Sequence, residues 1–170
     1  MEMQKIGVFY GSSTGNCEIV AKEIQRILGK DIVQLFDVAT CNPKNIRSYQ
    51  NLIFGVSTWG IGNLQEDWED FLPVLTVENL KNKTVALYGL GDQQTYSDSF
   101  VNGLGIMYDL IVDKGCSVIG NWPADGYQFD QSTAYRNNAF VGLVIDEDSQ
   151  SEKTYKRINM WMEQIKDVFL

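Results

Sequence analysis

Two kinds of hydrophobic stretch alternate along this 170-residue chain. Short apolar runs rich in β-branched and aromatic residues predict strands at 5–10, 31–37, 52–56 and 84–88, and a fifth strand in two pieces, at 116–120 and 140–145. Between them, apolar residues recur at helical spacing after residue 16, near 68–75, at 100–111 and at 155–169. This alternation predicts a parallel sheet covered by helices on both faces.

Several local signals refine these elements. Gly29 is expected to end the first helix, and the alternating pattern of the second strand indicates an edge position. Ser149 and Glu152 have the spacing of a capping box ahead of the last helix. Two helices are expected to bury a stripe, formed by Trp68, Phe71, Leu72 and Leu75 in one and by Tyr155, Ile158, Met162, Ile165 and Phe169 in the other.

The connections between the strands restrict the topology. Right-handed crossovers with one reversal after the first unit give a doubly wound five-stranded sheet of order 2-1-3-4-5. A ligand then binds at the carboxyl ends of strands one and three. A polar, Tyr-rich insertion, residues 121–139, splits strand five, and connections of that length are uncommon unless they are functional.

Composition narrows the function. The chain has the length of one domain, which we place at 1–170, and its net charge of −8 argues against nucleic acid and anionic membranes. Histidine is absent, which excludes His-based triads and His metal sites, and no metal site is expected. Three scattered cysteines, no membrane-spanning run and no room for a signal peptide before the first strand predict a cytoplasmic protein.

The loop at residues 11–16, which follows the first strand, has the composition of an anion cradle. Gly and hydroxyl residues at a strand-to-helix junction direct backbone N–H groups and the positive helix end at one point. No Lys or Arg occurs between Ile6 and Ala21, so the loop is not a nucleotide-hydrolysing P-loop. A plain polar turn whose Ser or Thr caps the helix stays an alternative. The cradle residues are Gly11, Ser12, Ser13, Thr14, Gly15 and Asn16.

Two further loops open at the same edge of the predicted sheet. The loop at 57–62 carries Trp59, and the loop at 89–96 carries Tyr96, each among glycines. A lone Trp after a strand is more often a packing residue. Two aromatics that converge beside an anion site instead predict a planar ring held between them, with each stacking contact contributing about 1–3 kcal/mol.

The chain resembles the long-chain flavodoxins from Ile6 to the last helix, and the resemblance rests on four motifs. These are GSSTGN at 11–16, TWGIG at 58–62, GDQQTYSD at 91–98 and WPADGY at 122–127. The resemblance implies a flavodoxin-like fold, non-covalently bound FMN, and an electron carrier that shuttles single electrons at low potential between redox proteins, without a substrate reaction of its own.

The resemblance also assigns roles to residues. It implies that Ser12 to Asn16 hold the phosphate, that Trp59 and Tyr96 flank the isoalloxazine, that Asp92 addresses its pyrimidine edge and that Asp148 lies near the ribityl chain. The peptide between Gly60 and Ile61 would turn to accept a hydrogen bond from the reduced ring. The rest of the expected cofactor-binding set is Cys17, Ser57, Thr58, Gly62, Gly91 and Asp98.

Cys17 departs from the family pattern, which commonly has Thr at this position. A thiol is a poor hydrogen-bond donor, so we expect FMN binding to be weaker by about 0.5–1.5 kcal/mol than with Thr.

The expected partners are flavin reductases and acceptor enzymes with basic docking surfaces, and we expect a monomer. An FMN-dependent quinone reductase on the same fold is the main alternative, although it needs a cavity for a second planar substrate. A phosphorylatable receiver domain needs acids after strands one and three, where this chain has Gly11-Ser12 and Ser57-Thr58.

Overall fold

The computed structural model describes residues 5–12, 14–59 and 62–169, and it leaves the side chain of Trp59 undescribed. The central parallel sheet has the order β2-β1-β3-β5-β6, which confirms the predicted order of five strands with β2 at the edge. In chain order the strands are β1 (Ile6–Tyr10), β2 (Val33–Asp37), β3 (Asn51–Trp59), β5 (Thr84–Leu90) and β6 (Ser117–Ile119).

The fifth strand is split as predicted. β6 pairs with the first half of β5, and β9 (Leu143–Ile145) pairs in parallel with its second half. The intervening segment folds back through a short hairpin of β7 (Tyr135–Arg136) and β8 (Ala139–Phe140), and Trp122 forms an isolated bridge with Phe140. The insertion is therefore an ordered structure with its own pairing.

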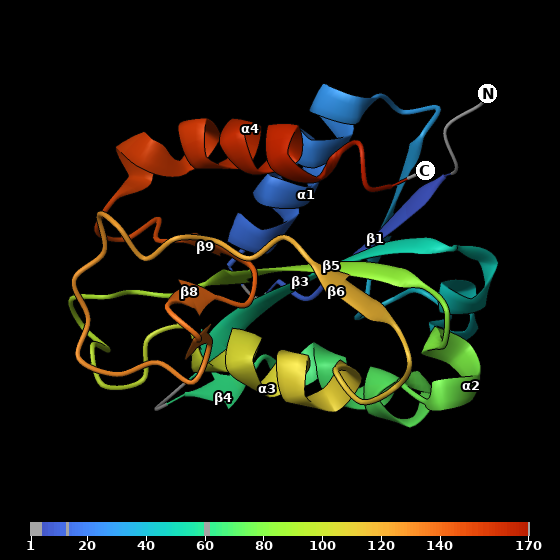
Figure 1. Ribbon diagram of the computed structural model, residues 1–170, viewed down its shortest axis with the longest axis horizontal. Coiled ribbons are helices and arrows are strands. Elements are labelled where there is room, and N and C mark those ends of the chain that lie inside the picture. Colours follow the sequence, from blue (N-terminus) through green and yellow to red (C-terminus); the bar gives the residue numbers. More distant parts are fainter. Residues whose placement is uncertain (1–4, 13, 60–61, 170) are drawn as a thin grey trace.

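Helices cover both faces of the sheet (Figure 1). α1 (Asn16–Leu28) and α4 (Thr154–Ile165) lie on one face, and α2 (Val77–Leu80) and α3 (Asn102–Ile111) lie on the other. Gly29, at a φ of 102°, ends α1 as predicted. The 3-10 segments are η1 (Pro43–Ser48), η2 (Glu66–Val74) and η3 (Ser151–Lys153). No helix among the described residues is both long and apolar enough to cross a membrane.

A helix forms near 68–75 as expected, but it is not an α-helix. The chain forms the 3-10 helix η2 there, with Pro73 inside it. Proline has no N–H for the i to i−4 bond and its ring crowds the preceding turn, which disfavours an α-helix. The tighter winding keeps Trp68, Phe71 and Leu75 buried, but it leaves Leu72 37% exposed.

The predicted capping box before α4 does not form. Instead, η3 precedes the helix, and Ser149 donates its hydroxyl to Asp92. The buried stripe also differs from the prediction, because Tyr155 is 56% exposed while Trp161 and Arg157 are buried. Arg157 stacks its guanidinium on the Tyr127 ring, 4.0 Å from the centroid, which stabilises this buried cation.

The third strand is longer than predicted. The hydrophobic run ends at Val56, but β3 continues to Trp59 and pairs antiparallel with β4 (Asn63–Leu64). Ser57 and Thr58 therefore lie on a strand and not in a loop. Side chains on a strand are held more rigidly than those on a loop, which matters because both residues line the site described next.

Candidate functional site

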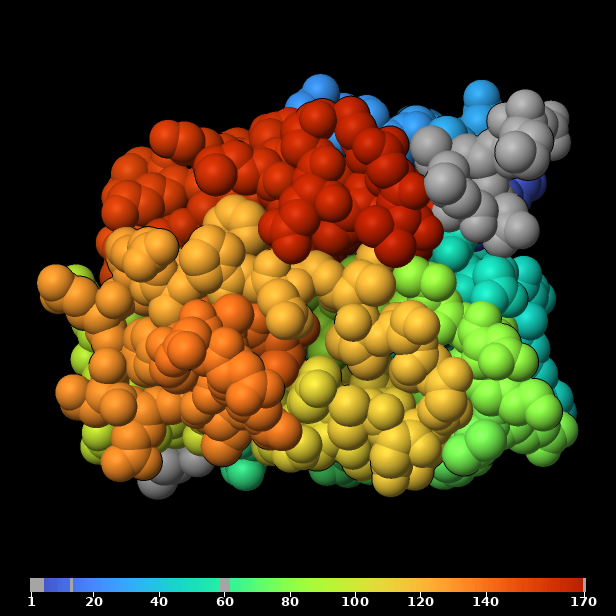
Figure 2. Space-filling model, in the orientation of Figure 1, coloured from blue at the N-terminus to red at the C-terminus, as the bar shows by residue number. Residues whose placement is uncertain are grey.

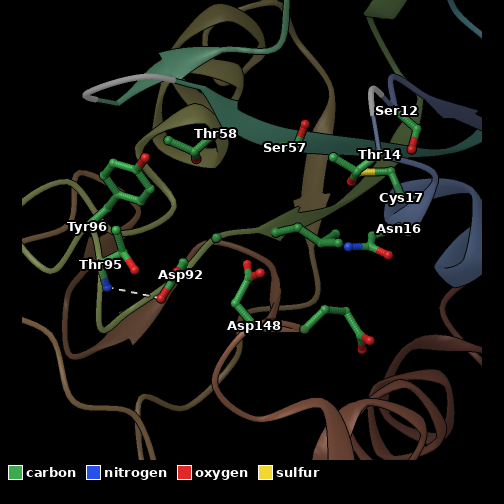
Figure 3. A pocket seen from close by; sticks show the side chains of 13 residues that line it. Ser12, Thr14, Asn16, Cys17, Ser57, Thr58, Asp92, Thr95, Tyr96 and Asp148 are labelled. Carbon is green, nitrogen blue, oxygen red and sulfur yellow. Dashed lines mark hydrogen bonds between the residues drawn. The ribbon is translucent and has the colours of Figure 1, made fainter.

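A cavity of about 340 Å³ opens at the carboxyl ends of β1, β3 and β5 (Figure 3). This is the location that the strand order predicts. The connection from β1 leads towards one edge of the sheet and the connection from β3 leads towards the other, so a crevice opens between these two strands. The size lies within the range of small-molecule sites. The lining residues are Ser12, Thr14, Asn16, Cys17, Ser57, Thr58, Leu90, Gly91, Asp92, Thr95, Tyr96, Glu147 and Asp148.

The cradle is held in place by the strands beneath it. The Gly11 amide donates to the Gly55 carbonyl at 3.1 Å, which continues the β1–β3 pairing into the loop. The Tyr88 hydroxyl, fully buried on β5, donates to the Cys17 carbonyl at 2.8 Å and so anchors the first turn of α1. Gly55 is required for this contact, because a Cβ there would collide with the Tyr88 ring.

The cradle fits an anion better than it fits an ordinary helix-capping turn. Gly15, at a φ of 88°, is the N-cap residue of α1, and no side chain among the described residues caps the helix. The Ser12 hydroxyl is buried and has no hydrogen-bond partner in the described part of the chain, and the buried Ser57 hydroxyl has the Cys17 thiol, a weak acceptor, beside it. An unpaired buried hydroxyl costs about 1–3 kcal/mol. The two hydroxyls, in the same cavity as the N-terminus of α1, therefore form a set of donors for an anion.

Cys17 lies at the bottom of this donor set, 1% exposed. Burial raises the pKa of the Cys17 thiol, and the Ser57 hydroxyl beside it opposes this only in part. The group therefore stays a neutral thiol at physiological pH. It adds no negative charge to the cradle, but it is a weak donor.

The opposite wall of the cavity is the loop at residues 91–98, here called the Tyr96 loop. Asp92 Oδ1 accepts from the Thr95 amide at 3.0 Å (Figure 3), from the Gln94 amide at 3.1 Å and from the Ser149 hydroxyl at 3.2 Å. Partial burial raises the pKa of Asp92, but the hydrogen bonds from Thr95, Gln94 and Ser149 outweigh it and bring the pKa below its usual value. The Asp92 carboxylate is thus charged and stabilises the turn of its own loop by accepting hydrogen bonds from the backbone amides.

Tyr96 and Asp148 complete this wall. The Tyr96 side chain is 47% exposed, which is unusual for an aromatic residue beside a cavity and leaves a ring face available for stacking. Partial burial and the neighbouring Asp92, Asp146 and Glu147 raise the pKa of Asp148. The cavity therefore has hydroxyls and a helix end on one side, and an aromatic ring with carboxylates on the other.

Most of the residues expected at the site come together there. Of the predicted set, the cavity is lined by Ser12, Thr14, Asn16, Cys17, Ser57, Thr58, Gly91, Asp92, Tyr96 and Asp148. Gly15 caps α1, Gly62 packs beside Ser99 and Asn102, and Asp98 lines a neighbouring hollow against the insertion. The expectations for Ser13, Gly60, Ile61 and the Trp59 side chain fall outside the described residues.

Three lining residues were not predicted from the sequence: Leu90, Thr95 and Glu147. Leu90 is the last residue of β5 and pairs with Ser57 across the sheet. Each of the three directly precedes a predicted residue, and Thr95 already lies inside the motif GDQQTYSD at 91–98, so taking the residue before each predicted one would have found them.

Comparisons with known proteins agree with this geometry. The family model for flavodoxin matches residues 8–161. Flavodoxin from Buchnera aphidicola subsp. Baizongia pistaciae is 49% identical over 166 residues, which cover 96% of this chain and 95% of that protein. Flavodoxin 1 from Escherichia coli K12 is 42% identical, covering 95% and 92%. The doubly wound sheet with a cradle at its switch point thus defines a flavodoxin-like protein.

A solved structure points the same way. Fusobacterium nucleatum flavodoxin bound to flavin mononucleotide superposes on this chain with a TM-score of 0.91 and 34% sequence identity, covering 99% of this chain and all of that one (100%). The chain belongs to the flavodoxin family.

Proposed function

We propose that this chain is an electron-transfer protein, a single domain over 1–170, that holds FMN without a covalent bond in the cavity at the carboxyl ends of β1, β3 and β5. The observation that carries the proposal is the buried Ser12 hydroxyl, which has no partner among the described residues and lies in the same cavity as the N-terminus of α1 and an exposed aromatic ring. The flavodoxin family membership and the FMN bound in the similar Fusobacterium structure support the same cofactor.

The cradle would bind the phosphate. Ser12 supplies a hydroxyl donor that lacks a partner in the described chain, and Ser57 supplies one that has only a weak thiol acceptor beside it. Thr14 and Asn16 line the same wall, and the first turn of α1 supplies its positive end. No cationic residue lines the cavity among the described residues. Binding therefore depends on directional hydrogen bonds, and Ser13 and Gly15 belong to the proposed phosphate set through their backbone.

The Tyr96 loop would hold the ring. Tyr96 offers an exposed face for stacking, Gly91 allows the backbone to come close, and Asp92 and Asp148 lie beside it. By the family resemblance Trp59 would flank the other side of the ring, and Thr58, Gly60, Ile61, Gly62 and Asp98 would complete the cofactor-binding set. FMN supplies the one-electron redox chemistry, and the residues of this chain bind it, orient it and keep water from its inner edge.

The acidic wall would make the bound cofactor a strong reductant. Asp92, Glu147 and Asp148 all line the cavity, and full reduction adds a further negative charge beside them. At about 10 Å and an effective dielectric of about 40–80, each carboxylate costs roughly 0.4–0.8 kcal/mol. Several such terms lower the reduction potential, which suits a donor to other redox proteins.

We infer that the partners are flavin reductases and acceptor enzymes with basic docking surfaces. The net charge of −8 and the acids around the exposed Tyr96 side chain favour such surfaces and disfavour nucleic acid and anionic membranes. We further infer that the protein is a cytoplasmic monomer that carries electrons and does not catalyse a substrate reaction.

The test is reconstitution followed by separate assays of reduction and turnover. The apoprotein should bind one FMN, accept electrons from a flavin reductase supplied with NADPH, and pass them to an acceptor such as cytochrome c. Direct NADPH oxidation with a quinone, in the absence of any reductase, would instead indicate the quinone reductase.

A further inference from the structure

The insertion lies against the cavity wall without forming part of it. Of the described residues that line the cavity, none comes from residues 120–142. In Figure 2 this segment forms the orange surface over one end of the molecule, with the Tyr96 loop at its edge. Hydrogen bonds join the two segments at two points, one on each side of Tyr96 in the sequence. The insertion can therefore act on the site through the loop.

The first junction is built around Gln93, which is only 3% exposed. Its backbone N–H and its side-chain amide both donate to Asp146 Oδ2, at 3.0 and 2.7 Å, and Asp146 is fully buried just after β9. The Gln93 side-chain oxygen accepts from the Gln128 backbone amide of the insertion at 2.6 Å. One side chain thus links the Tyr96 loop, the end of β9 and the insertion.

The buried carboxylate makes this junction rigid. Asp146 Oδ1 accepts from the amides of Asp148 and Ser149 at 3.1 and 2.8 Å. Each carboxylate oxygen of Asp146 therefore accepts two hydrogen bonds, Oδ2 from Gln93 and Oδ1 from the residues that follow β9. Hydrogen bonds to a buried carboxylate are stronger than those between neutral groups, and losing one leaves an unpaired group without water. The position of Gln93 is therefore strongly determined.

The second junction follows Tyr96 directly. The Ser97 carbonyl accepts from the amides of Asp130 and Gln131, both at 2.9 Å, and the Ser97 hydroxyl donates to Asp130 Oδ2 at 2.7 Å. Tyr96 itself is 47% exposed, so packing contributes little to its orientation. Its place in the cavity wall depends on the two junctions that fix the backbone on either side.

We propose that Gln93 is a positioning residue through which the insertion holds the Tyr96 loop, so that the insertion determines how well the ring half of the cavity is formed and leaves the cradle half unaffected. This inference rests on the proposed FMN site. The cradle depends on β1, β3 and α1, with Tyr88 as its anchor, and it makes no use of Gln93.

The experiment compares Gln93→Met with the matched control Gln94→Met. Methionine keeps the length of the side chain and the net charge but removes the two side-chain hydrogen bonds, to Asp146 Oδ2 and from the Gln128 amide. Gln94 is the control because its side chain is exposed on the same loop. Ser97→Ala tests the second junction by removing a surface hydrogen bond, and it serves as the alternative if Gln93→Met does not fold. Two dissociation constants are measured on apoprotein, one for FMN by fluorescence quenching and one for inorganic phosphate by competition with FMN.

We expect Gln93→Met to weaken FMN binding about tenfold and Ser97→Ala to weaken it about threefold, with the phosphate constant within twofold of the wild-type value. Gln94→Met should match the wild type in both constants. Unchanged FMN binding in Gln93→Met and Ser97→Ala, or an equal loss of phosphate binding, would overturn the proposal. Failure of the wild-type protein to bind FMN would instead refute the proposed function.

Discussion

The two walls of the cavity differ in how their polar groups are satisfied. In the cradle, the buried Ser12 hydroxyl has no partner among the described residues, the Ser57 hydroxyl has only a weak thiol acceptor beside it, and no described side chain caps α1. In the Tyr96 loop, Asp92 accepts three hydrogen bonds from its own surroundings, and the adjacent Gln93 is bonded on both sides. The cradle therefore offers hydrogen-bond donors to a ligand, whereas the polar groups of the Tyr96 loop already bond to one another and to neighbouring segments.

Because of this difference, we expect one wall to determine the affinity for the ligand and the other to determine its reduction potential. Unpaired buried donors are costly in the apoprotein, and an anion that pairs with them removes that cost on binding. The acids of the other wall are already paired or solvated and gain little from a ligand, but their charge acts on whatever lies between the walls. We therefore expect changes in the cradle to alter phosphate binding, and changes in the acids to alter the reduction potential.

The largest effect is expected for Ser12→Ala. A hydrogen bond to a phosphate contributes about 1.5–3 kcal/mol, so FMN should bind roughly 10- to 150-fold more weakly. The apoprotein should be as stable as the wild type or slightly more stable, because the variant removes a buried hydroxyl that has no partner among the described residues. Isothermal titration and urea unfolding measure the two effects.

The matched control is Ser117→Ala, at the start of β6 and the other end of the sheet. A loss of apoprotein stability in Ser12→Ala would show that the hydroxyl has a structural role.

Tyr96→Ala should weaken FMN by about 1–3 kcal/mol through lost stacking, while inorganic phosphate binds unchanged. Because the ring is 47% exposed, the free energy of unfolding of the apoprotein should change little. Tyr155→Ala is the control, since Tyr155 is 56% exposed on α4. If both ligands weaken together in Tyr96→Ala, the two walls are not independent.

Cys17→Thr should have the opposite sign and tighten FMN by about 0.5–1.5 kcal/mol, because a hydroxyl donor replaces a buried neutral thiol. Cys41→Ser, at a half-buried position outside the cavity, is the control. Equilibrium titration of the two apoproteins measures the difference. Equal or weaker affinity in Cys17→Thr would mean that the new hydroxyl is satisfied by Ser57 and not by the phosphate.

The smallest effect is expected for Asp148→Asn, which should raise the potential of the second reduction by roughly 20–35 mV at low salt. Burial and neighbouring carboxylates raise the pKa of Asp148, so its charge is present above that raised pKa and disappears as the pH falls through it. The difference from the wild type should therefore shrink in acid and at high salt. Asp113→Asn, beyond α3, is the control for a distant charge. A difference that does not depend on pH would remove Asp148 as the cause.

The sequence predicted the elements that depend on periodic burial. Buried runs such as 84–88 read correctly as strands because they are covered on both faces, and the reversal of the crossovers then determined where the cavity lies. The split of strand five could also be predicted, because apolar character stops at residue 120 and resumes near 140.

What the sequence could not predict depends on contacts between distant segments. The spacing of Ser149 and Glu152 matches a capping box, but the Ser149 hydroxyl is taken by Asp92, 57 residues away. Likewise, the extension of β3 to Trp59 needs the pairing with β4, which carries no hydrophobic signal of its own. Gln93 and Asp146 gave no motif at all, because a buried hydrogen-bonded pair is recognised only once the fold brings it together.

The most direct test of the electron-carrier assignment is an anaerobic redox titration of the FMN-loaded protein, followed by visible absorbance. We expect one FMN per chain, two separate one-electron steps with the second at the lower potential, and no reduction by NADPH until a flavin reductase is added. A single two-electron step, together with direct oxidation of NADPH by the protein alone, would contradict the assignment.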